Sequence, residues 1–167
     1  LGIGVDKETL QSTHIPQKVT LSPCKQVHSG GQFSVCVTDD GCVYSFGCNS
    51  DGELGIGTFI KSNYPVKIES MTDVDFIECG ANNVFCKTLT NELYCWGSNN
   101  FGQLGIISRE NQNTPYECKD WQGEDIVDIR CGDGFTVILR SNGEVFFCGL
   151  KLDESYHDGI SKFEKIE

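Results

Sequence analysis

The stretch SGGQFSVCVTDDGCVYSFG, residues 29–47, occurs in three versions in this chain. It aligns without a gap with CGANNVFCKTLTNELYCWG at residues 79–97, and again with CGDGFTVILRSNGEVFFCG at residues 131–149. The first two copies lie 50 residues apart and the last two lie 52 residues apart. Self-similarity at a fixed period is the sequence signature of repeat architectures. One unit of about fifty residues therefore accounts for most of the chain.

The segment behind each copy repeats as well. FGCNSDGELGIG at residues 46–57 matches WGSNNFGQLGI at residues 96–106, and LGIG at residues 1–4 matches residues 54–57. A proline-led segment recurs at residues 16–19, 65–68 and 115–118. The third copy departs from the pattern after Gly149, although KIE at its end recurs from the first unit. The chain thus contains about three units and a leading piece of another.

Each unit contains several short strand candidates joined by turn signals. In the first unit we predict strands at 24–29, 33–38, 42–46 and 65–68, and in the third unit residues 163–167 supply the last strand. The turns between the second and third strands are Asp39-Asp40-Gly41, Thr90-Asn91 and Asn142-Gly143. Such residues tolerate the positive φ of hairpin turns, and asparagine does so better than most. Four strands in each repeated unit predict an all-β fold, a partial β-propeller of about three four-stranded blades.

Six glycines keep the same register in all three copies. They are Gly30, Gly80 and Gly132 at one place, and Gly47, Gly97 and Gly149 at another. Glycine at a fixed register indicates positive φ or close approach of backbone, which inner strands crowded around an axis would require. A phosphate-binding loop is the alternative, but no glycine cluster is followed by a helix start with Lys-Ser/Thr. We therefore expect these glycines to be structural.

Charge narrows the classes of partner. The net charge of −11 disfavours nucleic acid and anionic membranes through this segment, because phosphate contacts need clustered Lys and Arg. No apolar run reaches the roughly 18 residues of a membrane span. Acidic residues could form a negative face for a basic protein partner, although a solvated surface explains them as well. They are Asp39, Asp40, Asp51, Glu53, Asp73 and Asp75.

Ten cysteines permit two interpretations, a disulfide framework or reduced thiols used as small buried residues. Five of them lie inside apolar runs: Cys36, Cys86, Cys95, Cys131 and Cys148. No Cys-x-x-Cys pair exists and the three histidines are scattered, so zinc-ligand spacing is missing. We favour reduced, buried thiols, and we expect neither a metal nor another cofactor. That cysteine chemistry indicates an intracellular protein, cytoplasmic or nuclear.

The unit resembles the regulator-of-chromosome-condensation repeat, most clearly over residues 27–57 and 77–105 and in part over 129–149. The resemblance implies a seven-bladed propeller, so we expect this chain to be a fragment of one. Residues 1–23 would end a preceding blade, residues 24–73 and 74–123 would each form a blade, and residues 124–167 would form a divergent blade. Uncovered blade faces would pair with further blades of the same parent chain or of another copy.

We predict a non-catalytic protein-protein interaction module. The alternative is part of a guanine-nucleotide exchange factor for a Ran-like or other small GTPase, which is the activity of the founding member of the resembled family. A third possibility is a closed oligomer of several short chains. The stacked Trp and Arg pattern of the plant ultraviolet receptors of this family is missing here, since the matching segments read GGQFS, GANNV and GDGFT.

Five aromatic residues in loops that vary between copies are candidate interaction residues: Phe59, Tyr64, Phe101, Trp121 and Tyr156. The competing interpretation is that they pack onto neighbouring blades. We expect residues 98–101 to form an exposed loop, with Leu104 pointing inward. No catalytic, cofactor-binding or metal-binding residue is predicted, because cysteine inside a strand is usually inert and no cleft with paired carboxylates is evident.

Overall fold

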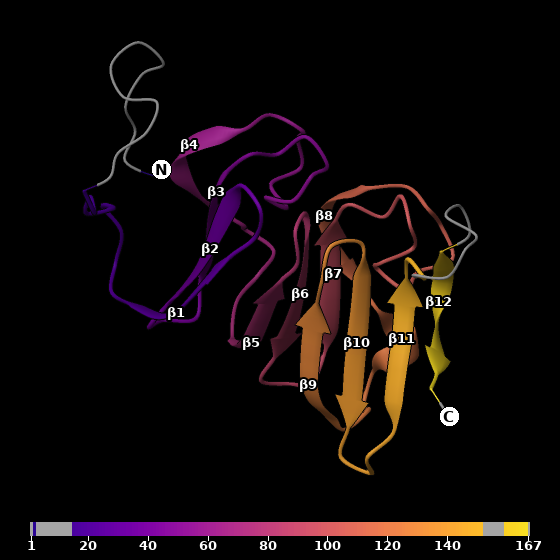
Figure 1. Cartoon of the computed structure of the whole chain (residues 1–167). Coiled ribbons are helices and arrows are strands. Elements are labelled where there is room, and N and C mark those ends of the chain that lie inside the picture. The colour runs from indigo at the N-terminus through magenta and orange to yellow at the C-terminus, as the bar shows by residue number, and fades with distance from the viewer. Residues whose placement is uncertain (1, 3–14, 152–158, 167) are drawn as a thin grey trace.

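The computed structural model describes residue 2, residues 15–151 and residues 159–166. These residues form three four-stranded antiparallel sheets that follow one another along the chain, from the indigo and magenta first sheet to the orange and yellow third sheet (Figure 1). The first sheet holds β1 (Cys24–Ser29), β2 (Phe33–Thr38), β3 (Val43–Gly47) and β4 (Ser62–Lys67). The second holds β5 (Val74–Cys79), β6 (Asn83–Thr88), β7 (Leu93–Gly97) and β8 (Gln112–Glu117). The third holds β9 (Ile126–Cys131), β10 (Phe135–Arg140), β11 (Val145–Gly149) and β12 (Ile160–Lys165).

The hairpins between the second and third strand of each sheet turn at the predicted residues. Gly41 has φ 81° and Gly143 has φ 84°, and Asn91 takes the equivalent place with φ 62°. The prediction that asparagine occupies a left-handed position here is confirmed. The turn therefore requires the same left-handed conformation in each copy, and each copy has glycine or asparagine there, the two residues that tolerate it best.

The fourth strand was the least accurately predicted. β4 begins at Ser62, three residues before the predicted start, so Tyr64 lies in a strand and not in a loop. The register nevertheless repeats: Gly47 is opposite Ser62, Gly97 is opposite Gln112 and Gly149 is opposite Ile160, each beside an irregularity in pairing. The divergent third copy thus keeps its fourth strand after its sequence pattern is lost.

Side chains from neighbouring sheets form the core. One cluster of buried residues joins the first and second sheets and includes Val35, Leu54 and Trp96, whereas a second joins the second and third sheets and includes Phe85 and Ile129. A single sheet could not bury both of its faces, so this stacking supplies the apolar burial that stabilises each unit. The prediction of about three four-stranded blades is confirmed.

The first strand of each sheet lies innermost, with β1 next to β5 and β5 next to β9. Backbone hydrogen bonds cross between the blades there, from the Gly31 N–H to the Ala81 carbonyl (2.8 Å) and from the Ala81 N–H to the Gly132 carbonyl (3.2 Å). A β-carbon built on Gly80 would lie 2.7 Å from the Gly132 carbonyl oxygen. The expected close approach of backbone at this glycine register is therefore confirmed.

Within the described residues the one helical segment is the 3-10 turn Lys119–Trp121, and no helix there has the length and hydropathy of a membrane span. The predicted blade boundaries at residues 23, 73 and 123 fall between strands, and the division of the chain at these points stays a prediction.

Candidate interaction surface

A loop that we call the corner follows the third strand in each of the first two blades, at residues 48–61 and 98–111. A buried asparagine organises it. Asn99 accepts a hydrogen bond from the Leu104 N–H (3.0 Å) and donates one to the Ser108 carbonyl (2.5 Å). The expectation that residues 98–101 are exposed was wrong for Ser98 and Asn99, which are buried. The amide has to lie inside the corner because it pairs backbone groups that would otherwise be buried without partners. Leu104 is fully buried, as expected.

The first residues of each corner contact the next blade. Asp51 accepts hydrogen bonds from Asn82 Nδ2 (2.7 Å) and Asn111 Nδ2 (2.9 Å), both in the second blade. Phe101 occupies the equivalent place in the second corner, and a β-carbon built on Gly134 would lie 3.0 Å from its ring. A polar contact at one blade junction is thus replaced by an aromatic contact at the next. Phe101 remains 39% exposed.

The predicted interaction residues differ in how far the structure exposes them. Phe59 is 51% exposed in the first corner, and Tyr64 is 57% exposed on β4. Trp121 instead packs edge-on against Phe146 and Phe163, with ring centroids 5.1 Å and 5.0 Å away. Its ring therefore helps to join the second and third blades, as the packing interpretation expects. Tyr156 lies outside the described residues.

Two strongly exposed aliphatic residues of the corners were not among the predicted interaction residues. Ile60 is 73% exposed at the tip of the first corner and Ile107 is 84% exposed in the second. Comparison of the loops copy by copy could have found Ile60, because Glu110 stands at the same place in the second unit. A charged equivalent indicates that the position faces solvent.

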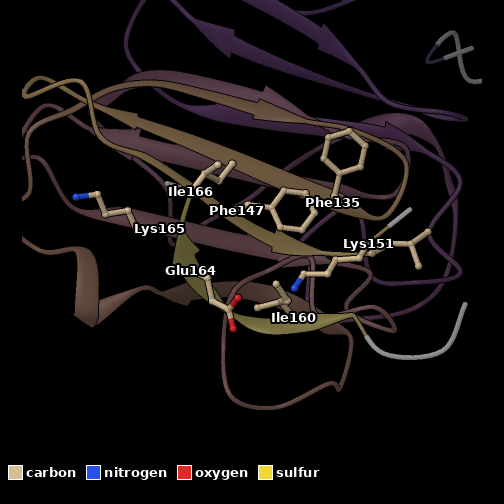
Figure 2. A pocket seen from close by; sticks show the side chains of 8 residues that line it. Phe135, Phe147, Lys151, Ile160, Glu164, Lys165 and Ile166 are labelled. Carbon is tan, nitrogen blue, oxygen red and sulfur yellow. The ribbon is translucent and has the colours of Figure 1, made fainter. Parts of the chain in front are cut away.

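The outer face of the third sheet carries an apolar hollow of about 390 Å³. Phe135 and Phe147 stack there with ring centroids 5.9 Å apart, and Ile160 and Ile166 approach from the β12 side, as Figure 2 shows. Charged side chains, among them Lys151, lie around it. The hollow is a sheet face of the kind that blades use against one another in the two internal interfaces.

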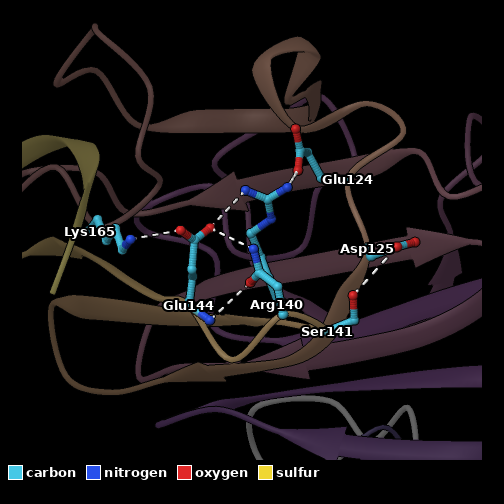
Figure 3. Close-up of polar contacts among 7 residues, drawn as sticks. Glu124, Asp125, Arg140, Ser141, Glu144 and Lys165 are labelled. Atoms are coloured by element: carbon cyan, nitrogen blue, oxygen red, sulfur yellow. Dashed lines mark hydrogen bonds and ion pairs between the residues drawn. The ribbon is translucent and has the colours of Figure 1, made fainter. Parts of the chain in front are cut away.

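A charged network fixes the last strand to the third sheet (Figure 3). Arg140 at the end of β10 forms ion pairs with Glu124 and with Glu144, the latter at 3.1 Å, and Lys165 of β12 lies 2.7 Å from Glu144. The hydrogen bond from Lys165, followed by that from Asn142, lowers the pKa of the Glu144 carboxyl. The carboxylates are held by cations of the same blade, so their role here is structural.

The cysteines are free thiols, and those at strand-interior positions are protected. Burial raises the pKa of Cys36 from 9.0 to about 11, with nearby Cys24 adding to the rise, and burial raises the pKa of Cys131 to about 12. Burial also raises the pKa of Cys86 and Cys95. Thiols held protonated in this way are poor nucleophiles and poor metal ligands. No group of three or more His, Cys, Asp or Glu suited to a metal ion lies within the described part of the chain.

We expect a thiol-specific disulfide reagent near pH 8 to modify the exposed Cys24 of the folded chain within minutes. Cys86, Cys95 and Cys148 should react only as the chain unfolds, because each is buried and protonated. Peptide mapping by mass spectrometry over a time course measures this order, and the same reaction in denaturant is the control. Equally fast labelling of Cys86 and Cys24 would contradict the described packing.

Comparison with known proteins gives the same repeat. A family model described as "Regulator of chromosome condensation (RCC1) repeat" matches residues 40–86 and 90–139, and a second model with that description matches residues 24–53 and 74–103. The serine/threonine-protein kinase Nek9 of Mus musculus is 34% identical over 157 residues. That match covers 90% of this chain but only 16% of the kinase, so the chain spans a small part of this relative.

Two solved structures share the fold. The crystal structure of human WBSCR16 superimposes with a TM-score of 0.79 at 22% identity, over 99% of this chain and 44% of that one. Prp20p of Saccharomyces cerevisiae, whose structure was described with its binding to Gsp1p and histones, superimposes with a TM-score of 0.74 at 21% identity. The match covers 92% of this chain and 40% of Prp20p. At these identities the likeness concerns the fold alone.

Proposed function

This chain belongs to the regulator of chromosome condensation repeat family, and from that premise we propose that it serves as a non-catalytic module that binds other proteins. The observation that carries the proposal is the construction of the corners. Buried Asn49 and Asn99 donate hydrogen bonds to equivalent backbone carbonyls, whereas the residues at the tips differ between copies. A fixed frame with variable exposed tips is typical of binding scaffolds.

Polar side chains of the inner strands hold the blades of this frame together. His28, Glu78 and Arg130 occupy equivalent places on β1, β5 and β9. Glu78 lies 3.7 Å from His28 Nδ1 and 3.4 Å from Arg130 Nη1. This carboxylate bridges three blades, and such a contact serves cohesion between them. The free thiols support a location in the reducing interior of a cell, cytoplasmic or nuclear.

The second candidate is a part of a guanine-nucleotide exchange factor for a small GTPase. It is favoured by the description of Prp20p, a structure of the same fold whose binding to Gsp1p is named. An interaction module and an exchange factor could both bind a GTPase, but only the second would accelerate nucleotide release.

Nucleotide release separates the two candidates. Ran and a panel of other small GTPases would be loaded with a fluorescent nucleotide and mixed with excess chain. We expect release rates to stay within about twofold of the spontaneous rates, because a scaffold does not favour the nucleotide-free state over the bound state. EDTA, which removes the magnesium ion, serves as the positive control. Accelerated release from any member of the panel would assign exchange activity instead.

A further inference from the structure

The tip of the first corner presents apolar side chains on a fixed backbone. Phe59 is 51% exposed and Ile60 is 73% exposed. Buried Asn49 donates hydrogen bonds to the carbonyls on either side of Phe59, at Thr58 (2.8 Å) and Ile60 (3.0 Å). The exposure of these side chains is therefore imposed by the fold of the corner. A preorganised apolar tip loses less conformational entropy on binding than a flexible loop would.

The repeat itself does not require apolar residues at this tip. Arg109 and Glu110 stand at the equivalent places in the second corner. Arg109 uses its guanidinium to reach the Gly159 carbonyl of the third blade (2.5 Å), so that tip strengthens a blade junction. Phenylalanine cannot donate such a hydrogen bond. At the first tip, an exposed phenylalanine ring thus stands where the second corner has a residue that joins two blades.

The charge around the first tip differs from that of the whole chain. Residues 54–68 contain Lys61 and Lys67 and no carboxylate, in a chain of net charge −11. Of the acidic residues that flank this segment, Asp51 accepts hydrogen bonds from two asparagines and Glu53 is buried. Glu69 lies 3.6 Å from Lys67, so Lys61 is the basic residue of this segment for which no ion pair is seen within the described residues. Tyr64, 57% exposed on the adjoining β4, adds a second aromatic. We define the first-blade tip as Phe59, Ile60, Lys61 and Tyr64.

We propose that the first-blade tip binds a protein partner that offers an apolar socket bordered by acidic residues. The inference rests on the proposed function and names the surface that carries it. Burial of Phe59 and Ile60 in the socket supplies the affinity, because removal of apolar surface from water is favourable and a few well-packed anchors carry most of the energy of an interface. Lys61 supplies the preference for an acidic border, through attraction that salt screens.

The test begins with the intact chain immobilised on a solid support and incubated with extract from the source cells. Two matched variants are treated in the same way. The double variant Phe59→Ser with Ile60→Ser removes the apolar tip. Ile107→Ser makes the same kind of change at the exposed aliphatic residue of the second corner. Each protein retained by the intact chain is then purified, and its affinity for all versions is measured by calorimetry. Thermal unfolding verifies that the variants remain folded.

We expect a purified partner to bind the double variant at least about tenfold more weakly than the intact chain, and Ile107→Ser with unchanged affinity. Lys61→Glu should also weaken binding, and its effect should shrink as salt is raised. A partner that binds the double variant as tightly as the intact chain would overturn the inference while the proposed function stands. If the chain retains no protein at all, both fail. An effect of the double variant without one of Lys61→Glu would refute the acidic border.

Discussion

Replacement of Trp96 by alanine should lower the free energy of unfolding by about 3–5 kcal/mol, which is the usual cost of emptying a large aromatic site in a core. Trp96 is fully buried between the first and second blades. Its ring lies against Gly55, where a β-carbon would be only 2.8 Å from Nε1, and Nε1 donates a hydrogen bond to the Glu53 carbonyl (3.0 Å). Alanine would leave both a cavity and a buried carbonyl without its partner.

Urea unfolding followed by circular dichroism measures this loss. The matched control is Tyr116→Ala, because Tyr116 is an aromatic of the same sheet that lies partly exposed on β8. Its replacement should change the free energy of unfolding by at most about 1 kcal/mol. A loss below that value for Trp96→Ala would show that the tryptophan does not join the blades as described.

The contact that Trp96 makes is supplied by a different sequence position in the third blade, so comparison of the copies does not predict it there. Phe46 and Cys148 stand at the same position in the other blades, and Cys148 is too small to cover the corner glycine of its neighbour. Phe163 of β12 fills that place instead, since a β-carbon on Gly105 would lie 2.2 Å from its ring. The Cys148 thiol keeps the hydrogen bond, donating to the Gln103 carbonyl (3.3 Å). Comparison of the copies could not predict this exchange, because Pro65 and Pro115 occupy the Phe163 position in the other copies.

Features that depend on local backbone geometry were predictable from sequence. The hairpin at Asn91 followed from the conformational preference of one residue, and the first two strands of the first blade were predicted at their observed bounds. The start of β4 was missed because Ser62 and Asn63 carry no alternating apolar pattern and Pro65 suggested the strand start. The burial of Asn99 was missed because an asparagine in a loop is usually solvated.

The candidate surface was less predictable, because exposure depends on what a neighbouring blade places nearby. Phe59 and Trp121 are both loop aromatics, and the aligned copies carry Arg109 and Met71 at their places. One is half exposed, whereas the other packs between Phe146 and Phe163, residues that lie more than twenty positions away along the chain. Comparison of the copies could have separated them, because a charged residue stands at the place of Phe59 and an apolar one at that of Trp121, but only the structure shows which rings Trp121 contacts. Whether Phe59, Tyr64, Phe101, Trp121 and Tyr156 contact a partner stays a prediction.

Replacement of Gly97 by alanine should cost about 3 kcal/mol or more in the free energy of unfolding. Gly97 has φ 97°, and a β-carbon there would lie 2.3 Å from the Asn82 carbonyl oxygen. That oxygen cannot move aside freely, because it accepts a hydrogen bond from the Ser98 N–H (2.8 Å). The substitution therefore combines an unfavourable backbone conformation with a clash against fixed backbone.

Gly143→Ala isolates the first of these two causes. Gly143 has φ 84°, close to the value at Gly97, yet a β-carbon there would meet no atom within 4 Å. Its replacement should cost only about 1–2 kcal/mol, the strain of a left-handed conformation in a residue with a side chain. The difference between the two variants, measured in the same urea titrations, is then the cost of the clash. Equal losses would mean that the third strand can part from Asn82 without penalty, and close packing at this corner would not be what selects glycine.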